Sequence, residues 1–520
     1  MLTMKQMARS GRMMAAIAAM AVALPAVSYS AGEGESAVAF DNSCAAGVQS
    51  DLQSAIARLH SFEASADTFR AVAEKDKGCA IAWWGAAMAA RGNPLGGDLD
   101  AESLKTGRSL LERAKVIKTT PREKAFIEAL GVYYRDYRAQ AERTKAYEAA
   151  MEKLSATYAA DAEAKTFYAL SILEAVDLFD KTYARQLKAG AILEAIWRDH
   201  PAHPGAPHYL IHAYDYAPLA QRALPAARRY AAIETSSPHA RHMPSHIFTM
   251  LGLWRESIEA NRKAHAALHA AHNGADSDTG SLHGFDFIAY ARLQLADDDD
   301  VKAGIKSLDE RGKRLPLVEA RYVLERAAWA EAGALAVPAD EPVAAANVRF
   351  VRALASARLG NAKEARSEWR ALGSLRAGVQ RTEGAYWASL VDIYLGAADA
   401  WIAQAEGRTD YARDKMLAIA DADDAREKHI YLENKLVPMR ELLGELLLEQ
   451  KRPREAAAAF EAALKASPNR FRGFLGAARA AKAAGDAAAA REWYGKLIAL
   501  VGASASRPEI AEARAFAQAK

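Results

Sequence analysis

The chain carries almost no net charge for its length. Its 520 residues include 68 lysines and arginines and 65 aspartates and glutamates, which gives a formal charge of +3. Residues 1–30 hold three of the basic residues and no acidic one, so the rest of the chain is balanced at 65 of each sign. The sequence also lacks a basic stripe with interleaved aromatic residues. Both absences argue against a nucleic-acid partner, and we expect none.

Long apolar runs are missing after the first thirty residues. A membrane-spanning helix needs about 20 consecutive apolar residues. The N-terminus instead has the pattern of a secretory signal peptide, with a basic start, a short apolar run from Met13 to Val27 and small residues before Ala31. An uncleaved N-terminal anchor is the alternative. We predict a signal peptide over residues 1–30 and a periplasmic or secreted mature chain without a membrane span.

Cysteine is scarce, with only Cys44 and Cys79 in the whole chain. An even number of cysteines in an exported protein predicts a disulfide, because thiols become oxidised outside the cytoplasm. Two free buried thiols are the alternative. If both sulfurs are in a disulfide, neither can act as a nucleophile.

Familiar catalytic motifs are also absent. The sequence contains no HExxH zinc-protease motif, no GxSxG nucleophile elbow and no phosphate-binding P-loop. The motifs therefore leave open whether the protein is an enzyme, and they identify no catalytic residue.

Alanine is abundant and valine and isoleucine are sparse, which favours helices over strands. Internal repeats are clearest near the C-terminus, where the pattern of Gly444, Ala456 and Phe460 recurs 34 residues later at Ala478, Ala490 and Tyr494. These are the small and aromatic positions of tetratricopeptide repeats, and weaker copies lie upstream. We predict an all-α fold of tetratricopeptide-like helical hairpins stacked into a superhelical solenoid.

Composition and the position of the aspartate run suggest three segments. The predicted signal peptide covers residues 1–30. A histidine-rich helical domain covers 31–300, and plainer tetratricopeptide repeats cover 301–520. The boundary is placed at the run Asp297–Asp300, which we predict to be a solvated loop because four like charges repel one another.

Histidine is concentrated in one stretch. The chain has 13 histidines, and the segment from His200 to His246 contains seven of them. His208, His212 and Asp215 have the i, i+4, i+7 spacing of one helix face. Pro207 can start that helix and Pro218 should end it, so we predict only two to three helical turns.

A second histidine pair, His242 and His246, repeats the i, i+4 step. Pro244 suits the first turn of a helix that carries His246. We predict that His239 and His242 lie in the loop before that helix.

A divalent transition metal needs several imidazoles or carboxylates that converge on one point. One helix can supply His208 and His212, and the neighbouring hairpin can supply His246 and His242. Asp215 can be a ligand or can orient an imidazole, and His60 is a secondary candidate. Ligation by imidazole without thiolate suits zinc, copper or iron. The alternative is structural, because buried histidines are often simply hydrogen-bonded core residues.

Short motifs between Cys44 and Asp297 carry a family resemblance. The most specific are HxxxHAxD at His208–Asp215 and HMPSHIF from His242, and weaker ones include Cys79–Met88 and Asn93–Leu95. In these segments the chain resembles a family of exported bacterial tetratricopeptide-repeat proteins. The resemblance implies a helical-repeat fold and an extracytoplasmic setting, and it brings no reaction. A further family motif, kept only loosely around Leu282–Phe287, adds His283 as a secondary candidate ligand.

Two functions follow from these patterns. The first is a scaffold that binds a protein, a peptide or a small ligand on its concave face. The second is a metalloprotein, or a metalloenzyme, with a histidine and aspartate cluster between adjacent hairpins. Metal analysis of the mature protein separates the two.

Overall fold

The structure is a computed structural model that describes residues 38–97, 99–135, 139–233, 237–271, 278–430, 432–502 and 505–518. The predicted signal peptide, residues 1–30, lies outside the described residues and stays a prediction. All described residues fall in one compact unit.

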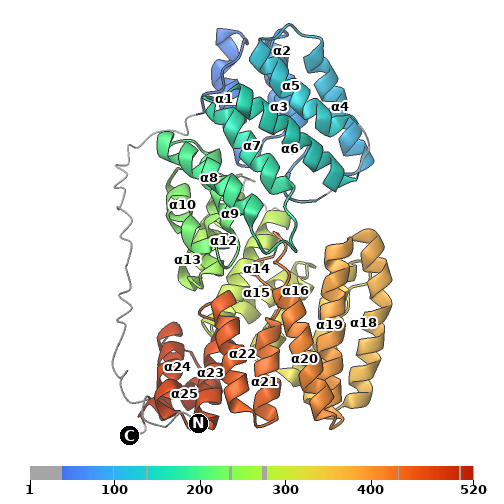
Figure 1. The fold of residues 1–520 in the computed structure, drawn as a ribbon, viewed down its shortest axis with the longest axis vertical. Helices are drawn as coiled ribbons and strands as arrows, with labels where there is room; N and C mark the ends of the chain where they lie inside the picture. Colours follow the sequence, from blue (N-terminus) through green and yellow to red (C-terminus); the bar gives the residue numbers. More distant parts are fainter. Residues whose placement is uncertain are drawn as a thin grey trace, which may run out of the picture. The chain divides into compact units, whose positions relative to one another are not determined.

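The described chain is all-α, as predicted. It forms helices α1 to α25 and two short 3-10 helices, and no described residue is in a β-strand. Consecutive helices pack against each other along the chain, as α21 with α22 and α18 with α19 do in Figure 1. The fold is therefore built from helical hairpins.

The helices before the histidine-rich segment are η1 (Ala46–Val48), α1 (Gln49–His60), α2 (Ala66–Lys75), α3 (Ala80–Ala89), α4 (Ala101–Lys115), α5 (Pro121–Tyr134), α6 (Gln140–Thr157), α7 (Ala162–Glu174) and α8 (Ala184–Asp199). The histidine-rich segment and the helices next to it form α9 (Gly205–Tyr214), α10 (Ala220–Ile233), α11 (Pro238–His242), α12 (Pro244–Met250), α13 (Trp254–Ala271) and α14 (Asp278–Gln294). The remaining helices are α15 (Asp298–Glu310), α16 (Pro316–Glu325), η2 (Trp329–Ala334), α17 (Pro342–Arg358), α18 (Ala362–Thr382), α19 (Ala385–Ala405), α20 (Thr409–Asp424), α21 (Met439–Glu449), α22 (Pro453–Ala466), α23 (Phe471–Ala483), α24 (Ala487–Leu500) and α25 (Pro508–Gln518).

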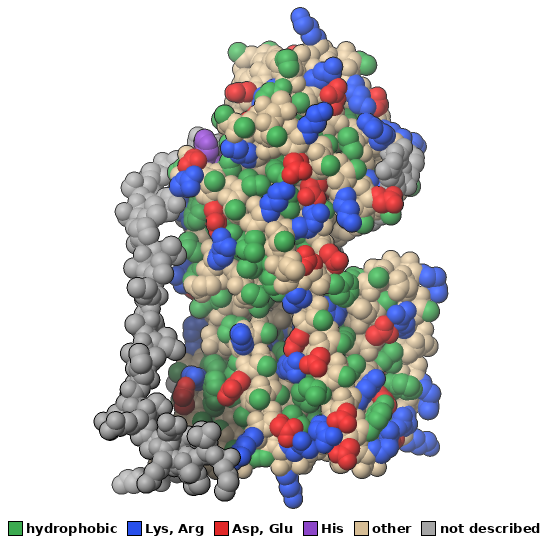
Figure 2. Space-filling model, in the orientation of Figure 1, with side chains coloured by type: hydrophobic (Ala, Val, Ile, Leu, Met, Phe, Trp, Pro, Cys, Tyr) green, Lys and Arg blue, Asp and Glu red, His purple; other side chains and the backbone are tan. Residues whose placement is uncertain are grey.

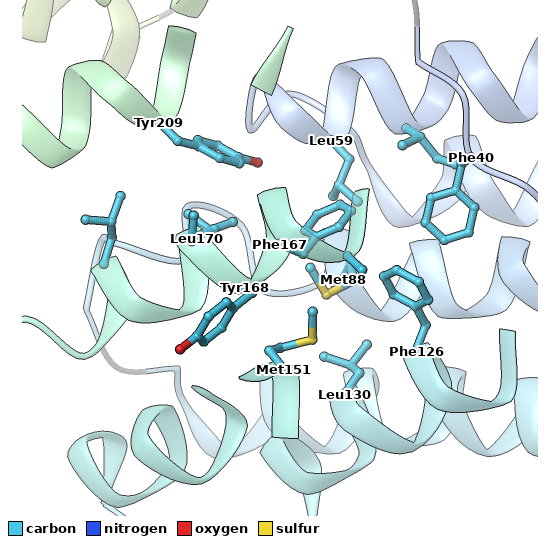
Figure 3. Packing of buried hydrophobic residues seen from close by; sticks show 14 of the residues in the cluster. Phe40, Leu59, Met88, Phe126, Leu130, Met151, Phe167, Tyr168, Leu170 and Tyr209 are labelled. Carbon is cyan, nitrogen blue, oxygen red and sulfur yellow. The ribbon is translucent and has the colours of Figure 1, made fainter. Parts of the chain in front are cut away.

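The core of the described residues consists of two large hydrophobic clusters and two small ones. One large cluster draws its residues from Phe40 to Ala260 and the other from Ala296 to Ala513. Figure 3 shows part of the first, where Phe126 and Phe167 lie near Met88 and other apolar side chains. The division of the chain at residue 300 stays a prediction.

The C-terminal repeat positions pack as their residue types require. A Cβ placed on Gly444 would lie 2.7 Å from the ring of Phe460, and one placed on Gly476 would lie 2.1 Å from the same ring. The two glycines therefore let α21 and α23 approach α22 closely, and the aromatic ring fills the space between them. The tetratricopeptide pattern predicts this packing of small residues against an aromatic one.

One predicted loop is a helix. The run Asp297–Asp300 was expected to be a solvated loop, but α15 begins at Asp298 and takes three aspartates into its first turn. Negative charge at a helix N-terminus is favoured by the helix dipole. Asp298 also accepts a hydrogen bond of 2.8 Å from the guanidinium of Arg507. These contacts offset the repulsion between the carboxylates.

The surface bears on two further expectations. Positive and negative side chains are mixed across the face seen in Figure 2, with no basic stripe on that face of the described residues. No helix among the described residues has both the length and the apolarity to span a membrane.

The predicted disulfide is confirmed, because Cys44 and Cys79 are bonded. The bond joins the segment before α1 to the start of α3, across 35 positions of sequence. We expect the double variant Cys44→Ala/Cys79→Ala to lower the free energy of unfolding by about 3–4 kcal/mol, since it restores conformational freedom to the unfolded chain. Urea denaturation measures the loss, and reduced wild-type protein should show the same one. A loss under about 1 kcal/mol would contradict this expectation.

The packing of Phe460 gives a second prediction. Gly476→Ala should lower the free energy of unfolding by about 1–3 kcal/mol, because the added methyl group overlaps the Phe460 ring. Gly495→Ala is the matched control, since Gly495 lies in α24 with no atom within 4 Å of an added Cβ. That change should raise stability by roughly 0.5–1 kcal/mol through helix propensity. Equal effects of the two variants in thermal unfolding would argue against the close packing.

Candidate metal centre

The first histidine helix, α9, is buried along its entire length from Gly205 to Tyr214. It has ten residues, in line with the two to three turns predicted, and it ends immediately before Asp215. It begins two residues before Pro207, because His203 Nδ1 accepts the backbone N–H groups of Gly205 (3.1 Å) and Ala206 (3.3 Å). A Cβ on Gly205 would lie 2.5 Å from His60 Nδ1, so this position needs glycine.

The second histidine segment differs from the sequence prediction. His239 and His242 were expected in a loop, but Pro238–His242 forms the short helix α11. Ser237 caps that helix by accepting the backbone N–H of Ala240 at 2.9 Å, and Pro238 occupies its first turn. The prolines thus divide two short helices, α11 and α12, where the sequence predicted a loop and one helix.

The structure brings His239 to the first predicted pair. His208 Nε2 lies 3.1 Å from His212 Nε2 and 3.3 Å from His239 Nε2. Ring nitrogens of all three lie within 4.8 Å of one another. We call His208, His212 and His239 the first histidine group.

The other predicted pair meets His283 of α14. His242 Nε2 and His246 Nε2 lie 3.0 Å apart, and the His283 ring centroid is 4.6 Å from that of His242. These three residues also offer nitrogens within 4.8 Å of one another. We call them the second histidine group.

The two groups are neighbours. The ring centroids of His212 and His246 are 6.2 Å apart, and those of His239 and His242 are 6.3 Å apart. The sequence prediction drew His208, His212, His242 and His246 into one site, whereas the structure divides them between two adjacent groups. Histidine is barely visible on the face shown in Figure 2, in keeping with the burial of these rings.

In three of the imidazole rings, Nδ1 forms a hydrogen bond that fixes the orientation of the ring. His208 Nδ1 donates to the backbone carbonyl of His60 at 2.5 Å. In the second group, His242 Nδ1 lies 2.6 Å from Asn261 Oδ1, and His246 Nδ1 lies 2.9 Å from Asp215 Oδ2. Asn261 Nδ2 donates to Ser257 O, which leaves Oδ1 as an acceptor.

These acceptors determine where the protons sit. Because a carbonyl, an amide oxygen and a carboxylate only accept, the Nδ1 atoms of His208, His242 and His246 carry the hydrogen. In a neutral ring the Nε2 atom then holds a lone pair. His242 and His246 therefore direct two lone pairs at each other across 3.0 Å, with no proton between them.

Burial keeps the rings neutral. It lowers the pKa of His208 to about 3 and that of His242 to about 4. Burial likewise lowers the pKa values of His212, His239, His246 and His283 well below the usual range for histidine. At neutral pH both groups therefore present uncharged nitrogen donors.

Asp215 belongs to neither of the two histidine groups. Its Oδ2 atom accepts from His246 Nδ1 and from the ammonium of Lys428, at 2.6 Å. Burial raises the pKa of the Asp215 carboxyl, and the positive charge of Lys428 opposes that effect. Asp215 thus orients an imidazole, one of the two roles the sequence suggested for it.

The side chain of His60 belongs to a separate buried group. Its Nε2 lies 2.8 Å from Glu163 Oε2, and its Nδ1 lies 3.1 Å from the hydroxyl of Tyr209. His203 Nε2 reaches the other carboxylate oxygen of Glu163 at 3.2 Å. Both imidazoles are fully hydrogen-bonded here, so the contribution of His60 to the histidine groups is its carbonyl oxygen.

Sequence reasoning missed His239, Asn261 and Lys428. His239 precedes His242 by three residues, and that spacing on a helix would have found it if Ser237-Pro238 had been interpreted as a helix start. Lys428 is 213 positions from Asp215, and nothing in the sequence connects the two.

Comparisons with known proteins add little. No family model matches the chain, and no curated protein sequence matches it. A solved crystal structure of the P58(IPK) TPR domain aligns with 69% of this chain and 97% of its own length, at 16% identity and a TM-score of 0.22. At a TM-score this low, the alignment is no evidence that the two proteins share a fold. The fold therefore rests on the helix pairing and packing described above.

The buried ion pair at Asp215 gives a testable prediction. Lys428→Met should lower the free energy of unfolding by about 3–5 kcal/mol, because it leaves a buried carboxylate without its cation. Lys75 provides the control, since it pairs with Asp51 and the two side chains are 62% and 49% exposed. Lys75→Met should cost under about 1 kcal/mol. Equal losses for the two variants in urea denaturation would show that the Asp215–Lys428 pair stabilises the fold no more than an exposed ion pair does.

Proposed function

We propose that the protein is a metalloprotein that binds divalent transition-metal ions, one in each histidine group. The observation that carries the proposal is the pair His242 Nε2 and His246 Nε2, 3.0 Å apart with both Nδ1 protons donated elsewhere. Two facing lone pairs repel unless a cation lies between them, and metal-binding histidines typically donate the other ring N–H to an oxygen acceptor.

The spacings support the same proposal. Nitrogens about 2.0–2.1 Å from a common tetrahedral ion lie roughly 3.3–3.4 Å apart. The observed separations in the first group, 3.1 Å and 3.3 Å, are close to that value. Catalytic zinc sites have three protein ligands and a fourth position left open, and three histidines are one of the known ligand sets.

The donor set limits the choice of ion. Neutral imidazoles suit zinc, copper or iron, whereas magnesium and calcium prefer oxygen. Asp215, Asn261 and the carbonyl of His60 would act one step outside the ion, by fixing ring orientation. A bound ion would supply Lewis acidity, or redox chemistry if it is copper or iron.

A second candidate function is a scaffold for a protein or peptide partner. A groove of about 810 Å³ between α4, α5 and α6 supports it. Its wall includes the apolar Leu111, Ile127 and Val132, and Lys124 and Lys153 also line it. We also propose that the chain belongs to the exported bacterial tetratricopeptide-repeat family and that it is periplasmic or secreted. Both proposals are compatible with the disulfide between Cys44 and Cys79.

The test is metal analysis of the mature protein, expressed without a histidine tag and exposed in turn to zinc, copper and iron. We expect about two ions per chain by mass spectrometry of dialysed samples, one for each three-histidine group. The variant His242→Ala/His246→Ala should lose one ion and His208→Ala/His212→Ala should lose the other.

The control is His269→Ala, because His269 is exposed on α13 and belongs to neither group. It should keep full metal content. Circular dichroism on every variant separates loss of ligands from loss of fold. A wild-type protein that stays metal-free after all three incubations would overturn the proposal.

A further inference from the structure

A pocket of about 410 Å³ reaches the first histidine group from outside. His212 lines it, together with Glu174 at the end of α7 and four aromatic side chains: Phe179, Tyr216, Tyr386 and His429. A pocket of this size, mostly apolar with a few polar atoms, is typical of small-molecule sites.

The pocket wall combines residues from before and after position 300 of the sequence, and contacts between the two parts hold it together. The backbone N–H of Glu427 donates to the carbonyl of Leu178 at 2.9 Å. Lys181 and Tyr183 both contact the Glu427 carboxylate. These contacts join the loop after α7 to the segment before α21, and so they bring Tyr386 and His429 to a site whose other side chains come from the histidine-rich half.

The aromatic rings are grouped at this wall. The ring centroid of Tyr386 is 5.4 Å from that of His429 and 6.3 Å from that of Phe179. Phe179 is 47% exposed, one of a few large hydrophobic side chains in the described residues that remain so open. An exposed aromatic ring beside other aromatic rings offers a face for a planar ligand.

Two of the residues that line the pocket each have a buried polar atom without a hydrogen-bond partner among the described residues. They are His212, through Nδ1, and Glu174, through Oε1. The Glu174 side chain is fully buried and its other oxygen is paired with Arg91, so its charge is already balanced. Such atoms cost free energy unless something satisfies them.

From this wall and these two atoms we propose that the pocket binds a small neutral aromatic compound that carries a hydroxyl group. The ring stacks on Phe179 and meets Tyr386 at an angle, because the planes of those two rings are inclined at 55°. A hydroxyl both donates and accepts, so it can donate to Glu174 Oε1 and accept from His212 Nδ1–H. The assignment to His212 rests on the proposed function, because Nδ1 carries the hydrogen when Nε2 is directed at an ion. The assignments to Glu174 and the aromatic rings do not.

The test is isothermal titration calorimetry of the mature protein with 4-methylphenol, and with 4-methylanisole as the probe that cannot donate. We expect saturable binding of 4-methylphenol at one site. The methyl ether should bind roughly ten- to a hundredfold more weakly, because it leaves Glu174 Oε1 unpartnered. Equal affinity for the two probes, or no saturable binding of the phenol, would overturn the proposal.

Phe179→Ala tests the wall with little risk to folding, because the side chain is half exposed. It should weaken 4-methylphenol binding about three- to tenfold. Leu417→Ala is the matched control, since Leu417 is 45% exposed and does not line the pocket. It should bind like wild type. A Phe179→Ala variant that also binds like wild type would contradict the proposed stacking.

Metal content is measured on the same samples, before and after treatment with EDTA. A protein that is metal-free before EDTA treatment and still prefers the phenol supports the pocket and counts against the metal proposal. A metal-loaded protein that binds neither probe does the reverse. The two proposals therefore fail separately.

Discussion

The hydrogen bonds on the outer side of the imidazoles are the constraint on which the rest of the site depends. His208, His242 and His246 each give the Nδ1 proton to an oxygen that can only accept. That commitment turns the Nε2 lone pairs inward, where they face other imidazole nitrogens at 3.0 to 3.3 Å. Without those acceptors the rings could rotate or change tautomer, and the facing nitrogens could satisfy one another.

The helical scaffold supplies these acceptors from distant parts of the chain. The carbonyl of His60 comes from the end of α1, and Asn261 comes from α13. Asp215 follows α9 directly and is held by Lys428, which lies after α20. These residues meet because some helices also contact helices that are not their neighbours in sequence, as α1 does with α9 and α11 with α14. The site therefore draws on residues from His60 to Lys428.

Much of this fold follows from local sequence rules. Gly444, Gly476 and Phe460 have the residue types that close helix packing needs, so the hairpins could be predicted. The ten residues of α9 match the two to three turns predicted from Pro207 and Pro218, although the helix begins two residues before Pro207 and ends at Tyr214. The i, i+4 spacing correctly placed His208 beside His212 and His242 beside His246.

The arrangement of the site could not be predicted in the same way. The segment with His239 and His242 is predicted to be a loop, although Ser237 caps a short helix there, and this hid His239. The two groups draw on α11 and α12, which are separate short helices, and the residue spacing does not show which histidines meet in which group. Lys428 and the aromatic wall of Tyr386 and His429 come from positions 140 or more residues beyond His246, the end of the histidine-rich segment. Contacts at that separation depend on how the hairpins stack.

The most direct measurement is the position of the ion itself. Crystals grown with zinc and measured at the zinc absorption edge would locate it by anomalous scattering. The account predicts two peaks, each about 2.0–2.1 Å from the Nε2 atoms of the histidines in its group, with the Nδ1 contacts to His60 O, Asn261 and Asp215 retained. A map without a peak in either group, with His242 Nε2 and His246 Nε2 turned away from each other, would contradict it.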